Sequence, residues 1–472
     1  MTQPPSGPPA TPAAPSVPAP PGASGPGSSA VPGPPRRTAW AEGAARLRAA
    51  AVTEPGRLRI IGAALAALVL AFGAVTAWQV SGRAAAAGDA LHHSQPLSAD
   101  AASVYRSLAD ADTTAAAAFL AGGDEPPELR ERYERDIRTA SRLLAEAAAN
   151  SGLSDRGRAE VTELNQRLPF YTGLVETARA NNRQGLPLGG AYLRHASEQM
   201  RTELLPAAEA LHRSETARLG RDHRDARSWP VAALLTGAAA LAALCWAQRR
   251  HYLRTNRVFN PGLLAATAAT AAALLWLVSA HGLARSALDA SDRCGARSLQ
   301  VLNEAWTGAL RARGDESMTL VARGGGAAYE ESYRKGMAEV AGGADGEPGG
   351  RLAEALALAD DEEGRRPVEK ALRAAADWRE HHAAARESEN GGHYDDAVDT
   401  VIGPGPDSAR GAFDAVEAGL AEAVRHEQRE FERAAGRGLD ALGGLPAGAG
   451  ALSVLGAAGV VLGIGRRLSE YR

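Results

Sequence analysis

The chain has 472 residues, of which 45% are hydrophobic and 23% are charged, and its formal net charge at pH 7 is −3. This balance lacks the basic excess with which nucleic-acid-binding proteins neutralise phosphates, so we expect no nucleic-acid partner. Apolar residues recur at helical spacing, and the alternation typical of strands is missing from the long polar segments. The sequence therefore predicts an all-α protein.

The first segment, residues 1–57, begins with a tail that is almost entirely Pro, Gly, Ala and Ser up to position 35. Such a composition cannot bury enough apolar surface to offset chain entropy. We therefore expect a disordered cytoplasmic tail that ends in a basic juxtamembrane segment. The tail serves either as a spacer or as a docking site for a soluble partner.

Four stretches are free of Asp, Glu, Lys and Arg for about twenty residues or more, which is the length a helix needs to cross a bilayer. The first of them lies too far from the N-terminus to be a cleaved signal peptide, so we expect it to be retained. The predicted transmembrane helices span residues 58–82, 228–248, 258–284 and 441–465. Small residues at four-residue spacing would allow close helix packing, and these are Ala63, Ala67, Ala71, Gly459 and Gly463.

Arginines gather in the short segments beside these spans, namely before the first span, in the loop 249–257 and in residues 466–472. Positive residues near span ends stay on the cytoplasmic side. We therefore expect a multi-pass protein of the cell membrane with both termini in the cytoplasm. The inner arginines are topology determinants or, alternatively, a docking surface, and the candidates are Arg249, Arg250, Arg254, Arg257, Arg466 and Arg467.

The long segments 83–227 and 285–440 are then extracytoplasmic, with net charges of −2 and −11. Acidic surfaces argue against binding to anionic lipid. Short breaks divide the helical periodicity of each segment into about four helices, which predicts two up-and-down helical bundles in tandem. Pro169 and Pro206 are expected to kink or restart their helices, and Gly88 and Pro96 are candidate interruptions of the helix that leaves the first span.

Similar landmarks recur in the same order in the two halves, which favours a duplication. A duplicated chain could contain its own pseudo-dimer, and a homodimer of chains is the alternative. The landmarks are Asp110, Asp112, Phe170, Tyr171 and Tyr192 in the first half and Asp315, Glu316, Trp378 and Tyr394 in the second.

Motifs typical of catalysis, nucleotide binding and zinc binding are missing from the sequence. We expect a protein that is not an enzyme and that has no cofactor and no metal site. The adjacent pairs His92-His93 and His381-His382 would point about 100° apart on a helix, and we interpret them as solvated. The spans hold no ionisable group at depth except the thiol of Cys245, so we do not expect transport.

Two runs carry a resemblance to a known family: YTGLVETARANNRQGLP at 171–187, continued by AYLR at 191–194, and GDESMTLVARG at 314–324. They resemble the GlnX-type family of four-span actinobacterial membrane proteins. The resemblance implies a relay. An extracytoplasmic amino-acid-binding lipoprotein (GlnH) would report aspartate or glutamate availability through the membrane protein to the cytoplasmic Ser/Thr kinase PknG.

The polar segment 181–185 is either an interaction surface, in which Arg183 could bind a carboxylate, or simply the end of one helix and the start of the next. Asp315 and Glu316 are interpreted as a solvated helix face or an N-cap, with a partner contact as the alternative. The candidate partner or ligand contacts are Asn181, Asn182, Arg183, Tyr192, Arg194, Asp315 and Glu316.

The leading hypothesis is a transmembrane signal transducer that resembles the sensory input of bacterial receptors at the level of fold. Because few residues follow the last span, we expect a separate cytoplasmic protein to receive the signal. The alternatives are a structural protein of the cell envelope and a direct receptor for a small molecule.

Overall fold

The computed structural model describes residues 54–123, 125–150, 152–255, 260–290, 296–343 and 349–468. Its contacts divide the chain into Met1–Arg57 and Leu58–Arg472, and the account below concerns the second unit. All regular elements in these described ranges are helices, which confirms the all-α prediction. The tail that we predict to be disordered lies outside them.

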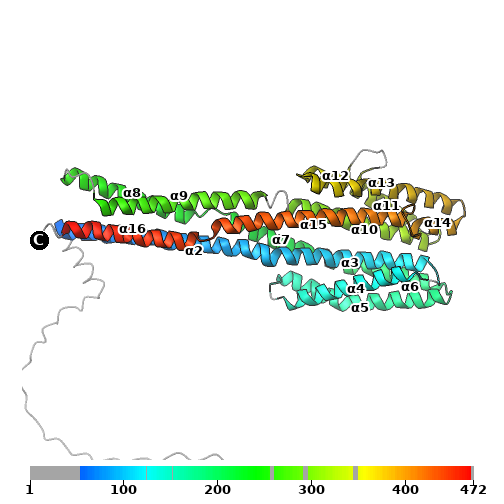
Figure 1. Ribbon diagram of the computed structural model, residues 1–472. Helices are drawn as coiled ribbons and strands as arrows, with labels where there is room; N and C mark the ends of the chain where they lie inside the picture. Colours follow the sequence, from blue (N-terminus) through cyan, green and yellow to red (C-terminus); the bar gives the residue numbers. More distant parts are fainter. Residues whose placement is uncertain are drawn as a thin grey trace, which may run out of the picture. The chain divides into compact units, whose positions relative to one another are not determined.

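Four helices are long and apolar enough to cross a membrane, as the sequence predicts. They pack side by side at one end of Leu58–Arg472 (Figure 1). One buried cluster contains residues of all four, among them Leu65, Leu244, Leu263 and Val460. The four are α2 (Glu54–Asp89), α8 (Val231–Thr255), α9 (Pro261–Ala290) and α16 (Leu445–Leu468).

Glycines bring α9 and α16 into backbone contact. A Cβ atom added at Gly262 would lie 2.4 Å from the carbonyl oxygen of Gly459 and 2.6 Å from Cα of Gly463. Small residues of this kind let membrane helices approach closely, so the interpretation of Gly459 and Gly463 agrees with the packing.

The same interpretation is wrong for Ala63, Ala67 and Ala71, which are exposed. The packed stripe of α2 instead contains Leu65 and Val69, which are buried. The choice between these neighbouring stripes depends on where the other helices lie, and an almost uniformly apolar helix carries no periodicity that reveals it.

The first bundle consists of four rods. Three of them are α3 (Gln95–Leu120), α4 (Pro127–Ala149) and α5 (Asp155–Arg183). The fourth is composed of α6 (Leu188–Gln199), the π-helix η2 (Met200–Leu204) and α7 (Leu205–Arg227). The start of α5 is fixed by Ser154, whose hydroxyl accepts a hydrogen bond from the backbone N–H of Gly157.

Two prolines are accommodated by π-helical turns. The π-helix η1 (Ala90–Ser94) immediately precedes the turn with Pro96, and η2 precedes Pro206. A proline cannot donate the usual i to i−4 hydrogen bond, and a wider turn absorbs its ring without ending the helix. The chain from α2 through η1 to α3 is therefore helical without a break, and Gly88 does not interrupt it. Pro169 lies inside α5, which also continues.

The second bundle repeats this plan with two additional short helices. Its long rods are α10 (Arg297–Val321), α11 (Ala327–Ala341), α13 (Glu362–Asn390) and α15 (Ala409–Leu442). The short helices are α12 (Gly350–Leu358) and α14 (Tyr394–Ile402). The sequence predicts about four helices in this segment, and these two short helices are additional to them.

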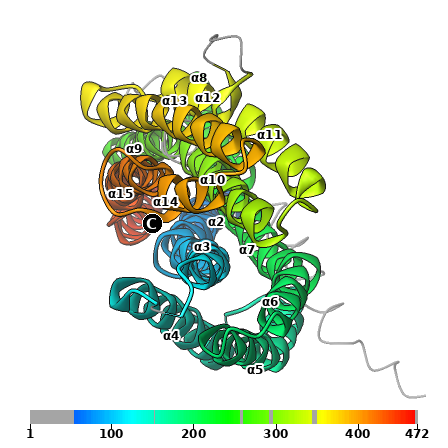
Figure 2. The same ribbon diagram turned by 90° about the vertical axis from the view of Figure 1, so that its right-hand side faces the viewer.

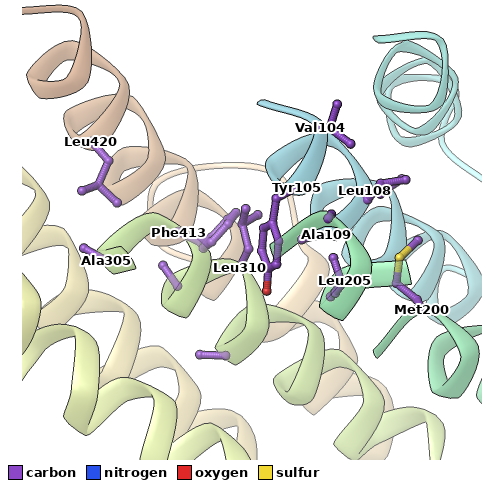
Figure 3. Close-up of a cluster of buried hydrophobic side chains, with 14 of the residues drawn as sticks. Val104, Tyr105, Leu108, Ala109, Met200, Leu205, Ala305, Leu310, Phe413 and Leu420 are labelled. Carbon is purple, nitrogen blue, oxygen red and sulfur yellow. The ribbon is translucent and has the colours of Figure 1, made fainter. Parts of the chain in front are cut away.

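The two bundles share one hydrophobic core. In the end-on view of Figure 2, α3 and α10 lie side by side at the centre, with the rest of the first bundle below and most of the second above. Tyr105 and Leu108 of α3 belong to the same buried cluster as Leu310 of α10 and Phe413 of α15 (Figure 3). The bundles therefore form one packed body.

The helix α2 is fastened to the break between α7 and α8. The guanidinium of Arg83 donates to the carbonyl oxygens of Ser228 and Trp229, at 2.6 and 2.8 Å. Those carbonyls lie at the break between α7 and α8, where regular helical hydrogen bonding stops. A second break, at Gly443-Gly444, separates α15 from α16, and Gly444 adopts a φ of +74° there.

Candidate functional site

A polar cleft of about 420 Å³ lies where the two bundles meet. Its walls come from α3, η2 and α7 of the first bundle and from α10 and α11 of the second. A wider cleft of about 870 Å³ adjoins it, because Gly308, Arg311 and Glu339 line both. Clefts of this volume and mixed polarity are typical of small-molecule sites.

Asp315 joins the two bundles inside this cleft. One carboxylate oxygen accepts a hydrogen bond from Arg201 of η2 at 2.8 Å, and the other accepts one from the hydroxyl of Ser332 of α11 at 2.5 Å. Arg201 also lies over the ring of Tyr329, 4.8 Å from its centroid. Burial raises the pKa of Asp315 despite these donors.

Asp112 forms the floor of the cleft on the side of the first bundle. Its carboxylate accepts hydrogen bonds from the hydroxyls of Tyr171 and Ser197, at 3.1 and 2.9 Å. Burial raises the pKa of Asp112 to about 6, and these two hydroxyls oppose the shift only in part. A buried carboxyl that titrates near neutral pH beside an accessible cleft is typical of functional sites.

The wider cleft is bordered by an arginine that links the bundles. Arg311 of α10 donates to the phenolic oxygen of Tyr105 of α3 at 2.5 Å, and it lies 3.4 Å from a carboxylate oxygen of Glu209 of α7. A ligand bound in either cleft would therefore contact both α3 and α10.

Glu316 lies at the centre of a second buried polar cluster, inside the second bundle. Trp378 donates to its carboxylate at 2.9 Å, His382 lies 3.0 Å from it through Nδ1, and Arg313 pairs with it. Burial alone would raise the pKa of Glu316, but Arg313 and His382 outweigh it and hold this pKa below its ordinary value. His382 also contacts Glu330 through Nε2 at 3.2 Å.

Two interpretations made from the sequence are wrong here. Asp315 and Glu316 do not form a solvated face, because they are 5% and 1% exposed. His382 is buried as well, at 6% exposed, whereas His92 and His93 are exposed as expected. A charged residue of a helix is expected at the surface unless a neighbouring helix supplies a charge of opposite sign. Here Glu316 of α10 and His382 of α13 supply such charges to each other.

The candidate contacts of the first bundle lie elsewhere. Asn181 and Asn182 belong to the last turn of α5, where Asn181 donates to the carbonyl oxygen of Thr177 at 2.8 Å. Asn182 donates to the carbonyl oxygen of Phe119 at 2.9 Å, which fastens α5 to the end of α3. This geometry fits the interpretation as a helix end, and none of these residues lines the polar cleft.

The remaining candidates of this region are at the surface. Arg183 and Arg194 are exposed, and Tyr192 is half-buried. Their role as a partner contact stays a prediction.

The basic candidates lie at the membrane-helix ends away from the bundles. Arg249 and Arg250 belong to the end of α8, and Arg250 lies over the ring of Trp246 at 5.3 Å. Arg466 is an exposed residue of α16. The side chains of Arg254 and Arg467 and all of Arg257 lie outside the described residues.

Sequence reasoning missed Arg201, Arg311, Ser332 and Lys335 of the cleft. Three of them look like ordinary surface residues of amphipathic helices, and only the packing of η2 against α10 and α11 brings them together. Lys335 had a possible signal, because it is one of only two lysines among the 52 basic residues of the chain.

Helical bundles that lead into four membrane-length helices define this chain as a multi-pass helical membrane protein. Residues 86–224 match the family model of the actinobacterial sensor domain. The match runs from the end of α2 through most of α7, and so covers the first bundle. Together with the four spans it fits an actinobacterial sensor membrane protein. The comparisons with curated proteins and with solved structures find no match.

Proposed function

We propose that this protein is a non-enzymatic transmembrane signal transducer. Its bundles lie outside the cytoplasm and sense a ligand or a ligand-loaded amino-acid-binding lipoprotein. Its inner segments regulate a separate cytoplasmic Ser/Thr kinase. The similarity of residues 86–224 to a sensor domain supports the sensing role, and the resemblance to GlnX-type proteins supports the choice of partners.

The observation that carries the proposal is the unbroken helix from α2 through η1 to α3. At one end α3 supplies Ala109, Asp112 and Thr113 to the polar cleft. At the other end α2 packs among the membrane helices. A continuous helix transmits a small translation or rotation along its length, because its backbone hydrogen bonds keep neighbouring turns at fixed spacing.

A direct receptor for a small polar molecule is the second candidate, and the cleft itself favours it. Arg201, Arg311 and Lys335 could pair with an anionic group, and Asp112 or Asp315 could accept from an ammonium group. A ligand that carries both kinds of group would displace pairs that now join the two bundles.

Calorimetric titration of the full chain in lipid nanodiscs separates the two candidates. The full chain is needed because the two bundles share a core. Aspartate, glutamate and glutamine would be titrated with and without the amino-acid-binding lipoprotein. Binding to the chain alone supports the direct receptor, and binding that requires the loaded lipoprotein supports the relay. Failure of all three amino acids under both conditions would contradict amino-acid sensing.

The two lysines provide an internal control for the position of binding. Lys335 lines the cleft and its side chain is 72% exposed, whereas Lys370 lies on α13 and is 55% exposed. An occupant of the cleft should slow acetylation of Lys335 by acetic anhydride, measured by mass spectrometry, and leave Lys370 unchanged. Equal protection of both lysines would contradict binding in the cleft.

A further inference from the structure

A histidine and two carboxylates converge where the start of α13 meets α15. None of the three lines the polar cleft. They are Asp361, His426 and Glu430, and one ligand atom from each lies within 4.8 Å of the others. His426 and Glu430 are four residues apart on α15, so they lie on the same face of that helix. Asp361 comes from the N-cap of α13.

The imidazole of His426 is buried without a hydrogen bond at Nε2. The residue is 5% exposed, and Nε2 lies 3.1 Å from Oδ1 of Asp361 but not in hydrogen-bonding geometry. Two ligand atoms that share one metal ion, each bonded at about 2.0–2.2 Å, lie roughly 3 Å apart across a bond angle of 90–110°. The separation of Nε2 and Oδ1 is compatible with joint ligation, and the orientation of the two groups does not give a hydrogen bond between them.

A second unsatisfied group lies beside this cluster. Glu427 is 3% exposed, and its Oε2 atom has no hydrogen-bond partner among the described residues. Its Oε1 atom lies at the same cluster, because Oε1, Oδ1 of Asp361 and the ring of His426 all surround the position of a Cβ atom added at Gly364, at 3.2–3.5 Å. An ionised carboxylate that is buried among other carboxylates is costly unless a cation compensates it.

We propose that Asp361, His426 and Glu430 bind a divalent transition-metal cation of the zinc class, with water completing the coordination. One imidazole nitrogen and two carboxylates are a ligand set that such ions accept. Asp361 can serve while it caps α13, because Oδ1 uses one lone pair to accept from the N–H of Gly364 at 2.6 Å and has a second lone pair for the metal. This proposal departs from the expectation of no metal site and does not depend on the proposed function.

The cation would clamp the turn between α12 and α13 to α15, the helix that leads to the membrane helix α16. Sequence reasoning missed the site because Asp361 lies 65 positions before His426, far outside the spacing of zinc motifs. The pair at i and i+4 on α15 was the signal that could have suggested it.

Calorimetric titration of the full chain tests the proposal, with detergent-solubilised protein freed of metal by a chelator. We expect one Zn²⁺ per chain, with Ca²⁺ bound much more weakly. His426→Gln should weaken Zn²⁺ binding about a hundredfold or more, since even loss of an outer-shell partner costs about 10–100-fold. The control His195→Gln, at an exposed position of α6, should bind as the wild type does.

A second variant guards against loss of folding in the first. Glu430 is only half-buried, so Glu430→Gln should keep the helical circular dichroism of the wild type and still bind Zn²⁺ more weakly. Weaker binding by both variants with an unchanged control supports the site. Absence of stoichiometric Zn²⁺ binding in the wild type would overturn it, and so would wild-type affinity in either variant.

Discussion

Each bundle buries two carboxylates on its central helix, and one from each helix, Asp112 and Glu316, shows how differently they behave. Asp112 of α3 meets the hydroxyls of Tyr171 and Ser197, whereas Glu316 of α10 meets Trp378 together with cationic partners. The aromatic partner comes from the equivalent helix, α5 or α13, in both cases. A duplication would produce such a geometry, and it stays a prediction. Burial acts to raise both pKa values, and only the partners of Glu316 outweigh it, so the two pKa values move in opposite directions.

The raised pKa of Asp112 predicts a specific pH dependence. Because the folded value is about 6 and the ordinary value is 3.8, the folded state binds the proton more tightly. The contribution to stability is therefore complete below about pH 4 and is lost as pH rises through 6. Asp112→Asn should reduce the change in unfolding free energy between pH 4 and 6 by about 2 kcal/mol. Denaturant unfolding at both pH values measures this, and the exposed Asp377→Asn should leave the slope unchanged.

The ion pair of Glu316 and His382 predicts how the unfolding free energy depends on pH. Burial would lower the pKa of His382, but Glu316 and Glu330 together raise it above 6.5. The contribution of the protonated imidazole is present below the ordinary histidine value and is lost as pH rises through the folded one. His382→Gln should lower the unfolding free energy by about 1.5–3 kcal/mol at pH 6, and by less at pH 9. The neighbour His381→Gln is the control, and an equal loss in both variants would contradict a special role of His382.

At the scale of elements, apolar periodicity and breakers predict most of the helices, because each amphipathic helix records its own buried face. Pro96 was a candidate interruption and Pro206 was expected to kink or restart its helix, but both follow a π-helical turn in a helix that continues. The π-turns before them could not be predicted, because a helix can accommodate a proline by a kink, a break or a wider turn. Tertiary packing decides which of these forms. The short helices α12 and α14 were missed for the same reason, since helices of nine residues depend on tertiary support.

The candidate site was harder to predict than the helices. Asp315 is one of the candidate contacts named from the sequence, but its partners Arg201 and Ser332 come from segments 114 and 17 positions away. Sequence periodicity identifies which face of a helix is apolar, but not which polar faces of two helices will meet. Residues at such a junction therefore look like solvated ones until the packing is known.

The glycine contact between α9 and α16 predicts sensitivity to a single methyl group. Gly262→Ala would place a Cβ atom 2.4 Å from a backbone oxygen of α16, so the helices must separate. We expect a loss of about 1–3 kcal/mol, typical of overpacking. Gly282→Ala on the same helix meets no atom within 4 Å and is the matched control. Thermal unfolding in detergent measures both, and equal melting of the two variants would contradict the close approach.

At the scale of the whole molecule, the bundles are joined through charged groups as well as through the shared core. Arg132 of α4 binds both oxygens of Asp110 in α3, at 2.8 and 2.9 Å, and reaches Asp414 and Glu417 of α15. One guanidinium thus holds three carboxylates from both bundles. Burial and the charge of Asp110 together raise the pKa of Glu417 to about 7 against the opposing Arg132.

Removal of Arg132 should therefore be severe. Arg132→Leu leaves partly buried carboxylates without their counter-charge, and breaking such a group costs about 3–5 kcal/mol. Arg130→Leu on the same helix removes only an exposed pair with Glu134, worth about 0.3–0.5 kcal/mol. Chemical denaturation of both variants at neutral pH makes the comparison. Similar losses would mean that Arg132 does not join the bundles.

The central claim is that occupancy of the cleft moves the continuous helix α2–η1–α3 relative to the other membrane helices. Spin labels at Ala63 of α2 and Tyr252 of α8, both exposed, report this at the membrane-helix ends away from the bundles. Pulsed electron paramagnetic resonance would measure their separation in nanodiscs, with whichever amino acid or loaded lipoprotein binds in the calorimetric titration. The account predicts a shift of about 1–2 Å on binding, typical of helix movements in switching proteins. An unchanged distance at saturation would contradict it.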